Sequence, residues 1–143
     1  MKYHFKVHRN KDWYWAECIE LGGCRTQGQT KEKLLRNLHE ALNLYLDEPA
    51  DSKIILPLPK KQTSGKSIVA VSVSPKTAFA FYLRTLRLRR GMTQKEAAKK
   101  LGMKNLYSYQ RLESSKTANP ELATLIRLKE VFPEFSVDVI VSN

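Results

Sequence analysis

The 143-residue chain has only two cysteines, no long apolar run and fewer acidic than basic residues. Its first ten residues, MKYHFKVHRN, lack the apolar segment of a secretion signal, so we expect a cytoplasmic protein. In that setting Cys18 and Cys24 are expected to be reduced core residues, with a disulfide between them as the alternative. No stretch approaches the roughly 20 apolar residues of a membrane-spanning helix, which predicts no membrane partner.

The shortage of acidic residues is concentrated in one part of the chain. Lys and Arg number 25 against 14 for Asp and Glu, which gives a formal charge of +11. Between Arg84 and Lys116 ten basic residues stand against two acidic ones. A polyanion such as nucleic acid is therefore the partner that the charge favours, and this stretch is where we expect it to bind.

The first half alternates between strand and helix patterns. Residues 3–8 have the period of two of a half-buried strand, and 13–19 and 24–30 follow as partners after polar or glycine-containing turns. A helix with apolar positions at helical spacing is predicted to begin after Thr30, which can cap it. Residues 49–67 read as a connector, and 68–73 as a returning strand. We predict an α+β fold whose first domain, 1–76, is a small sheet with one packed helix.

The second half, 77–143, is predicted to be an all-α domain with a short strand at its C-terminal end. Helices are expected over 78–90, over 93–101 with Thr93 as cap, over about 105–114, and from Pro120 to residue 132. Glycines at 91 and 102 end the first two helices. The tail FSVDVIV alternates like a strand.

Two of these helices have the character of a helix-turn-helix. Ala98 and Gly102 supply the small residues that a close helix crossing and a tight turn require. The helix after the turn is polar, as expected for a surface that faces a duplex, and Leu106, Tyr109 and Leu112 are predicted to hold it down.

A known motif is matched by Thr93, Gln94, Ala98, Leu101, Gly102, Leu112, Glu113 and Pro120. Through these residues the segment 86–120 resembles the Cro/C1-type, or XRE-like, helix-turn-helix domain. It departs from the usual pattern in two ways: one additional residue lies between Gly102 and Glu113, and Ser114-Ser115 replaces a common glycine.

This resemblance implies binding to operator double-stranded DNA. Leu106 suits a thymine methyl group and Arg111 suits guanine, and Asn105 and Tyr107 are the other candidates for facing bases. Gln94 resembles the family residue that grips a phosphate. The further candidates for phosphate contact are Thr93, Lys104, Ser108 and Lys116.

Domains of this kind usually act as dimers on two half-sites. We predict a homodimer in which the C-terminal strand, with Phe135, Val137, Val139 and Val141, pairs with its copy. The alternative is pairing within one chain to the strand at 68–73.

Catalysis and metal binding are not expected from the first domain. His4 and His8 lie four residues apart on a strand, roughly 13 Å, which is too far for one ion, and we expect both on its polar surface. No cluster of carboxylates suggests two-metal chemistry. A nucleophilic pair of Cys24 and His39 is the remaining catalytic alternative. We therefore expect no enzyme activity, no metal and no cofactor.

The segment that begins at Trp13 retains the residues of a second known motif, namely Tyr14, Trp15, Ala16, Glu20, Leu21, Gly23, Cys24, Thr26, Gly28 and Thr30. Through them the chain resembles the HicB antitoxin domain over about residues 1–75. Ile19 and Gly22 stand where prolines are usual, and Leu34-Leu35 where Glu-Ala is common.

The HicB resemblance implies a partial ribonuclease H-like fold and the role of a type II antitoxin. Such a protein binds and inhibits a HicA-type mRNA-cleaving toxin and represses its own operon, and its assembly can enlarge with toxin. Two alternatives remain: a stand-alone transcription regulator with a ligand-sensing N-terminal domain, and a degenerate nuclease. The proposed toxin contacts are Trp13, Glu17, Glu20, Asp47, Glu48 and Asp51.

Overall fold

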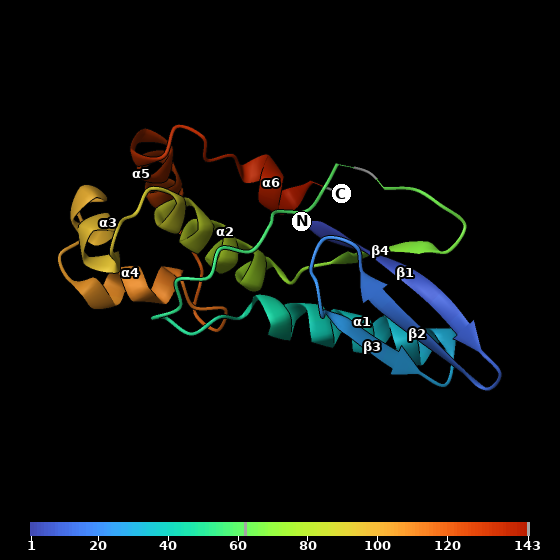
Figure 1. Cartoon of the computed structure of the whole chain (residues 1–143). Helices are drawn as coiled ribbons and strands as arrows, with labels where there is room; N and C mark the ends of the chain where they lie inside the picture. Colours follow the sequence, from blue (N-terminus) through green and yellow to red (C-terminus); the bar gives the residue numbers. More distant parts are fainter. Residues whose placement is uncertain (62, 143) are drawn as a thin grey trace. The chain divides into compact units, whose positions relative to one another are not determined.

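The computed structural model describes residues 1–61 and 63–142 and divides the chain into two compact units (Figure 1). The sheet unit comprises Met1–Leu46, Leu56–Ser74 and Ser142, and the helical unit comprises Asp47–Ile55 and Pro75–Val141. This division differs from the expected boundary after residue 76 mainly because residues 47–55 pack with the helices. The described part of the predicted connector 49–67 contains no helix or strand, and Gln62 lies outside the described residues.

The sheet unit contains four antiparallel strands: β1 (Lys2–Asn10), β2 (Trp13–Cys18), β3 (Arg25–Gly28) and β4 (Ile68–Ser72). Their order in the sheet is β3-β2-β1-β4. Phe5 of β1 lies opposite Cys18 on one side and Val69 on the other. The predicted meander and the return of residues 68–73 to its edge are both confirmed.

Helix α1 (Lys31–Leu46) lies along one face of this sheet (Figure 1). It buries a leucine at every fourth position, Leu34, Leu38, Leu42 and Leu46, against the apolar face of the strands. Full burial of each such side chain contributes about 1.5–3 kcal/mol. The backbone N–H of Lys33 donates to Thr30 Oγ1 at 3.1 Å, which confirms the predicted cap.

The sheet unit corrects two predictions about surface residues. His4 is buried, and its Nδ1 lies 2.9 Å from Glu20 Oε2. The same carboxylate accepts hydrogen bonds from the backbone N–H of His4 at 2.8 Å and of Lys60 at 3.1 Å. Only 1% of the Glu20 side chain is exposed, so it cannot serve as the free surface acid that we expected. The residues that follow β2 fold back onto β1, and this long-range contact is absent from the local sequence pattern.

The helical unit contains α2 (Pro75–Arg89), α3 (Gln94–Lys100), α4 (Leu106–Leu112), α5 (Leu122–Val131) and α6 (Val137–Val141). Helix α2 is buried from Thr77 to Arg87. The first four helices were predicted, except that α5 begins at Leu122, after Glu121 as N-cap, and not at Pro120. None of the helices in the described part of the chain combines the length and apolarity needed to cross a membrane.

The C-terminal segment is a helix, so the predicted strand is wrong. Ser136 Oγ accepts from the backbone N–H of Asp138 at 3.3 Å, and the Ser136 carbonyl accepts from Val139 at 3.2 Å. These bonds begin a helical turn, and they override the alternation of polar and apolar residues. Both predicted strand pairings, with a second copy and with β4, fail for the same reason.

Candidate nucleic-acid interface

Helix α3 and the turn after it are built by one cap and by small residues. Thr93 Oγ1 accepts from the backbone N–H of Glu96 at 3.1 Å, as predicted for the N-cap. Ala97 and Ala98 are buried, which allows α4 to approach closely, as Figure 1 shows. Gly102 follows at φ +68°, a conformation that glycine adopts without strain. The predicted helix-turn-helix geometry is therefore present.

Asn105 and Ser108 form the start of α4. Asn105 is the N-cap, and its Oδ1 accepts from the backbone N–H of Ser108 at 2.8 Å and from the Ser108 hydroxyl at 2.9 Å. We predicted a base contact for Asn105 and a phosphate contact for Ser108. Their side chains stabilise the first turn of the helix, a role that the Asn-x-x-Ser spacing could have indicated, and the two DNA contacts stay predictions.

The outer side of α4 carries Leu106, Tyr107 and Arg111, all of which are exposed, with 64% of Tyr107 accessible. The Arg111 guanidinium carbon lies 5.9 Å from the centre of the Tyr107 ring, one helical turn away. Tyr109 and Leu112 are buried on the opposite side, as predicted. Leu106 does not anchor the helix with them, so its side chain is available for an apolar contact outside the protein.

A buried polar cluster lies behind α4 and connects it to α2. Arg87 donates to Glu113 through Nε at 2.6 Å and through Nη2 at 2.9 Å, and it also donates to the Met92 carbonyl at 2.9 Å. The Tyr109 hydroxyl donates to the same carboxylate. Burial alone would lower the pKa of Arg87, but the hydrogen bonds and charge of Glu113 raise it. The pKa of Tyr109 is raised by burial and by the neighbouring carboxylate.

Gln94, the first residue of α3, is joined to this cluster. Its Nε2 lies 3.4 Å from Glu113 Oε1, and its Oε1 lies 3.4 Å from Gln110 Nε2 on α4. These bonds hold the half-buried Gln94 beside α4. The roles of Arg87 and Gln110 were not predicted, although a charged residue within the apolar pattern of 78–90 was a signal for Arg87.

The remaining predicted phosphate contacts lie around the two helices. Lys104 is exposed in the turn before α4, and Lys116 is exposed after its end. Thr93 is exposed at the start of α3, but its hydroxyl already bonds Glu96. The two lysines and Arg111 therefore supply the cationic groups that could contact a phosphate backbone.

The predicted toxin contacts belong to two different units of the chain. Trp13 and Glu17 lie on β2 in the sheet unit, on the face opposite α1. Trp13 is half-buried and Glu17 is exposed. The Glu17 Oε1 atom lies 3.4 Å from His8 Nε2. Trp15, between them, stacks on His8 with ring centres 4.1 Å apart, so it packs on this open face and not in the core.

The other three acids belong to the helical unit. Asp47 Oδ1 accepts from the Ser115 hydroxyl at 2.8 Å, and the Glu48 carbonyl accepts from Arg84 at 3.3 Å. Asp51 lies in the same segment, Asp47–Ile55. Assigning these residues to the first domain was wrong, because the segment after α1 packs with the helices before the chain returns to β4.

A comparison with known families bears on the second half of the chain. Residues 78–132, which run from α2 through α5, match a family described as a helix-turn-helix domain. The match supports the XRE-like helix-turn-helix and indicates DNA binding and transcription regulation. It does not extend to the sheet unit. No curated protein matches the sequence.

Proposed function

We propose that the chain is the antitoxin of a type II toxin-antitoxin system. In this proposal the helical unit binds operator DNA and represses the operon, and the sheet unit binds and inhibits a HicA-type mRNA-cleaving toxin. The observation that carries the DNA-binding part is the exposed Leu106, Tyr107 and Arg111 surface of α4, supported from behind by the buried Arg87–Glu113 pair.

Helix α4 would enter the major groove with its outer side toward the bases. Arg111 is long enough to donate to the O6 and N7 atoms of guanine, and Leu106 offers an apolar surface to a thymine methyl group. Gln94, Lys104 and Lys116 would contact phosphates and set the orientation of the helix. Because Glu113 bonds Gln94 and closes α4, the same carboxylate would fix the phosphate contact relative to the base contacts.

A dimer would use exposed apolar residues of α5 and α6. Leu122 and Ile126 lie one turn apart on α5 and are 79% and 62% exposed. Val137 and Val141 are exposed on α6. Exposed apolar side chains on neighbouring turns of a helix are typical of protein contacts, and a second copy of the helical unit would cover them. Two copies would place two α4 helices on two half-sites.

The proposal that the sheet unit binds a toxin is supported by the HicB resemblance and by the structural roles of three motif residues. A Cβ atom added to Gly28 would lie 2.5 Å from the Leu34 nitrogen, so a glycine is required where β3 passes beneath α1. Gly23 adopts φ +83° in the turn before β3, and Cys24 is buried directly after it. Trp13 and Glu17 on the open sheet face would contact the toxin, and inhibition would require only that its active site be covered.

The DNA-binding part is tested with a fragment of the chain's own promoter and an unrelated fragment of equal length. Arg111→Ala is expected to cost about 1–3 kcal/mol of binding to the promoter and to reduce the preference for it. Lys104→Ala should weaken binding to both fragments alike and lower the salt dependence. Arg36→Ala, which removes an exposed charge from α1, is the matched control. Unchanged preference in the Arg111 variant would contradict the proposal.

The toxin-binding part is tested by co-expression with the neighbouring open reading frame. A small basic protein that co-purifies with this chain and arrests growth without it is the expected result. The Trp13→Ala variant should recover less of that protein, whereas Arg36→Ala should recover an equal amount. Failure of any neighbouring product to bind or to arrest growth would contradict the antitoxin proposal and leave the DNA-binding result intact.

A second candidate function, a transcription regulator with a ligand-sensing N-terminal domain, is favoured by one observation. The sheet unit contains a cavity of about 330 Å³ between its sheet and α1. Cavities of this size hold small molecules in many proteins. In this case promoter binding would change when a small molecule is added, with no toxin present.

A further inference from the structure

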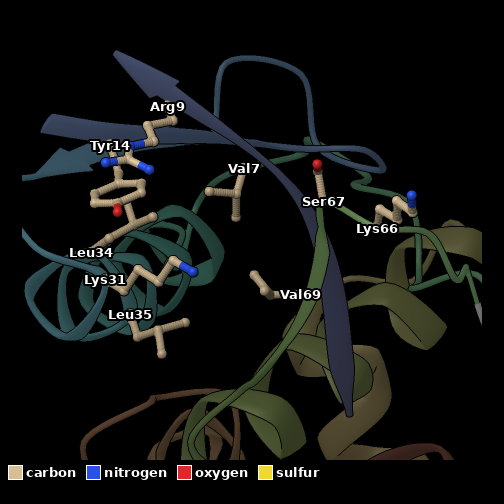
Figure 2. Close-up of a pocket in the computed structure, with 9 residues that line it drawn as sticks. All are labelled: Val7, Arg9, Tyr14, Lys31, Leu34, Leu35, Lys66, Ser67 and Val69. Atoms are coloured by element: carbon tan, nitrogen blue, oxygen red, sulfur yellow. The ribbon is translucent and has the colours of Figure 1, made fainter. Parts of the chain in front are cut away.

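The cavity in the sheet unit is lined by apolar side chains on two sides (Figure 2). Val7 and Val69 come from the neighbouring strands β1 and β4, and Leu34 and Leu35 come from the first turns of α1. Tyr14 of β2 forms a further wall. Leu35 is 47% exposed, so part of its side chain is accessible to an occupant of the cavity. The cavity therefore favours an apolar occupant.

The rim of the same cavity is cationic. Arg9, Lys31 and Lys66 all line it, and no acidic residue is among its lining residues. Across residues 1–61 and 63–142, none of these three cations forms a salt bridge within 4.0 Å. Figure 2 shows the Lys31 ammonium group directed toward the open space beside Val7 and Val69, whereas the Lys66 ammonium group points away from this space.

Two features hold positive charge at the mouth. The Arg9 guanidinium carbon lies 5.7 Å from the centre of the Tyr14 ring, so this cation rests on the aromatic wall of the cavity. Lys31 is the first residue of α1, so its charge adds to the positive end of the helix dipole. The acidic residue of this first turn, Glu32, is not among the lining residues of the cavity. The mouth is therefore suited to a negative group.

We propose that this cavity binds an organic monoanion with an apolar body, of the kind represented by a medium-chain carboxylate. The carboxylate would lie between Lys31 and Arg9, and the hydrocarbon would lie against Val7, Val69 and Leu35. A neutral hydrocarbon would leave the cations unpaired. A nucleic acid or a polyphosphate would contact the cationic rim but leave the apolar walls uncovered, because neither has a hydrocarbon body to place against them.

This inference names a ligand class for the second candidate function, but its test needs neither DNA nor toxin. Isothermal titration calorimetry of the full chain would use decanoate and decylammonium below their micelle concentrations and decanol below its solubility limit. We expect saturable binding of one decanoate per chain, binding of decanol weaker by about tenfold or more, and no saturable binding of decylammonium. Loss of this order between decanoate and decanol is the effect of removing one charge-assisted contact.

Variants separate the cavity from non-specific binding. Lys31→Gln is expected to weaken decanoate binding by about tenfold, because it removes a charge-assisted contact from the mouth. Lys33→Gln is the matched control, since this lysine lies two residues further along the same helix, lines a different hollow beside Trp13, and should leave decanoate binding unchanged. Leu35→Asn, at a half-exposed position, should weaken the binding of decanoate and of decanol alike.

The outcomes are decisive in both directions. Absence of saturable decanoate binding, equal binding of decanol, or equal effects of Lys31→Gln and Lys33→Gln would each overturn the proposal. Circular dichroism of every variant verifies that the fold is retained. Because promoter binding and toxin capture are measured separately, a negative result here leaves the antitoxin proposal standing. A positive result with no effect of decanoate on promoter binding would retain the cavity as a binding site and remove the ligand-sensing function.

Discussion

In the helical unit Glu113 accepts hydrogen bonds mostly from side chains, whereas in the sheet unit Glu20 accepts two of its bonds from backbone N–H groups. Glu113 is opposed by a full and permanent charge on Arg87, but Glu20 is opposed by His4 and by peptide dipoles. A buried carboxylate can therefore be stabilised by an ion pair that fixes helices, or by backbone groups that fix a loop. The two arrangements should respond differently to the loss of the negative charge.

The largest effect is expected at the ion pair of the helical unit. Glu113→Gln removes the charge that compensates the buried Arg87 guanidinium, and breaking such a pair costs about 3–5 kcal/mol of folding free energy. The same variant should lose promoter binding, because Gln94 and α4 lose their common partner. Urea unfolding followed by circular dichroism measures the first effect.

The exposed ion pair of Arg90 with Glu134 is the matched control for this experiment. It has the same shortest distance, 2.6 Å, but both side chains are more than one third exposed. Surface pairs contribute about 0–1 kcal/mol, so Glu134→Gln should hardly change the urea midpoint. If both variants lost equal stability, burial would not be the reason for the importance of Glu113.

A smaller effect is expected at Glu20. Glu20→Gln keeps one carbonyl oxygen as an acceptor but loses the second oxygen, so one buried N–H group is left without its partner. The expected cost is about 1–3 kcal/mol, below that of Glu113→Gln. Glu17→Gln, on the exposed face of the same sheet, should change stability by less than about 0.5 kcal/mol. A loss at Glu20 larger than at Glu113 would reverse our ranking of the two arrangements.

The sequence predicted the elements that depend on local patterns. The alternation in β1, the leucine spacing of α1, and the caps at Thr30 and Thr93 involve residues close together in the chain, so each pattern could be read directly. The family match at 78–132 further agrees with the predicted helix-turn-helix. Residues 137–141 were the exception, because the alternation over residues 135–141 predicts a strand whereas the capping serine at 136 begins a helix.

The features that escaped prediction depend on contacts distant in sequence. Glu20 bonds Lys60 across 40 residues, and Arg87 bonds Glu113 across 26. No local pattern records such a contact, so Glu20 was expected at the surface and Arg87 was overlooked. For the same reason the cavity between β1, β4 and α1 could not be predicted, since its walls come together only when residues 66–69 return to the sheet.

The smallest effect concerns the two thiols of the sheet unit, which are neutral core groups beside the buried carboxylate. Burial raises the pKa of Cys18 to about 11, although nearby backbone hydrogen bonds lower it, and burial together with Cys18 raises the pKa of Cys24 to about 12. Both thiols should react slowly with Ellman's reagent at pH 8 and rapidly in urea. Fast labelling of the native chain would show that they are accessible.

The sign of the thiol effect on stability follows from these raised pKa values. Folding favours the neutral thiols, so their contribution is fully present below the ordinary pKa of 9.0 and is lost as the pH rises toward 11 and 12. The free energy of unfolding should therefore fall between pH 9 and pH 11. Near neutral pH the thiols should cause no change of this free energy with pH. Burial also raises the pKa of Tyr3, which acts in the same direction. In the double variant Cys18→Ala, Cys24→Ala the free energy of unfolding should fall less with pH, because only other groups such as Tyr3 then contribute. If the native chain and the double variant showed the same slope against pH, the thiols would not be desolvated.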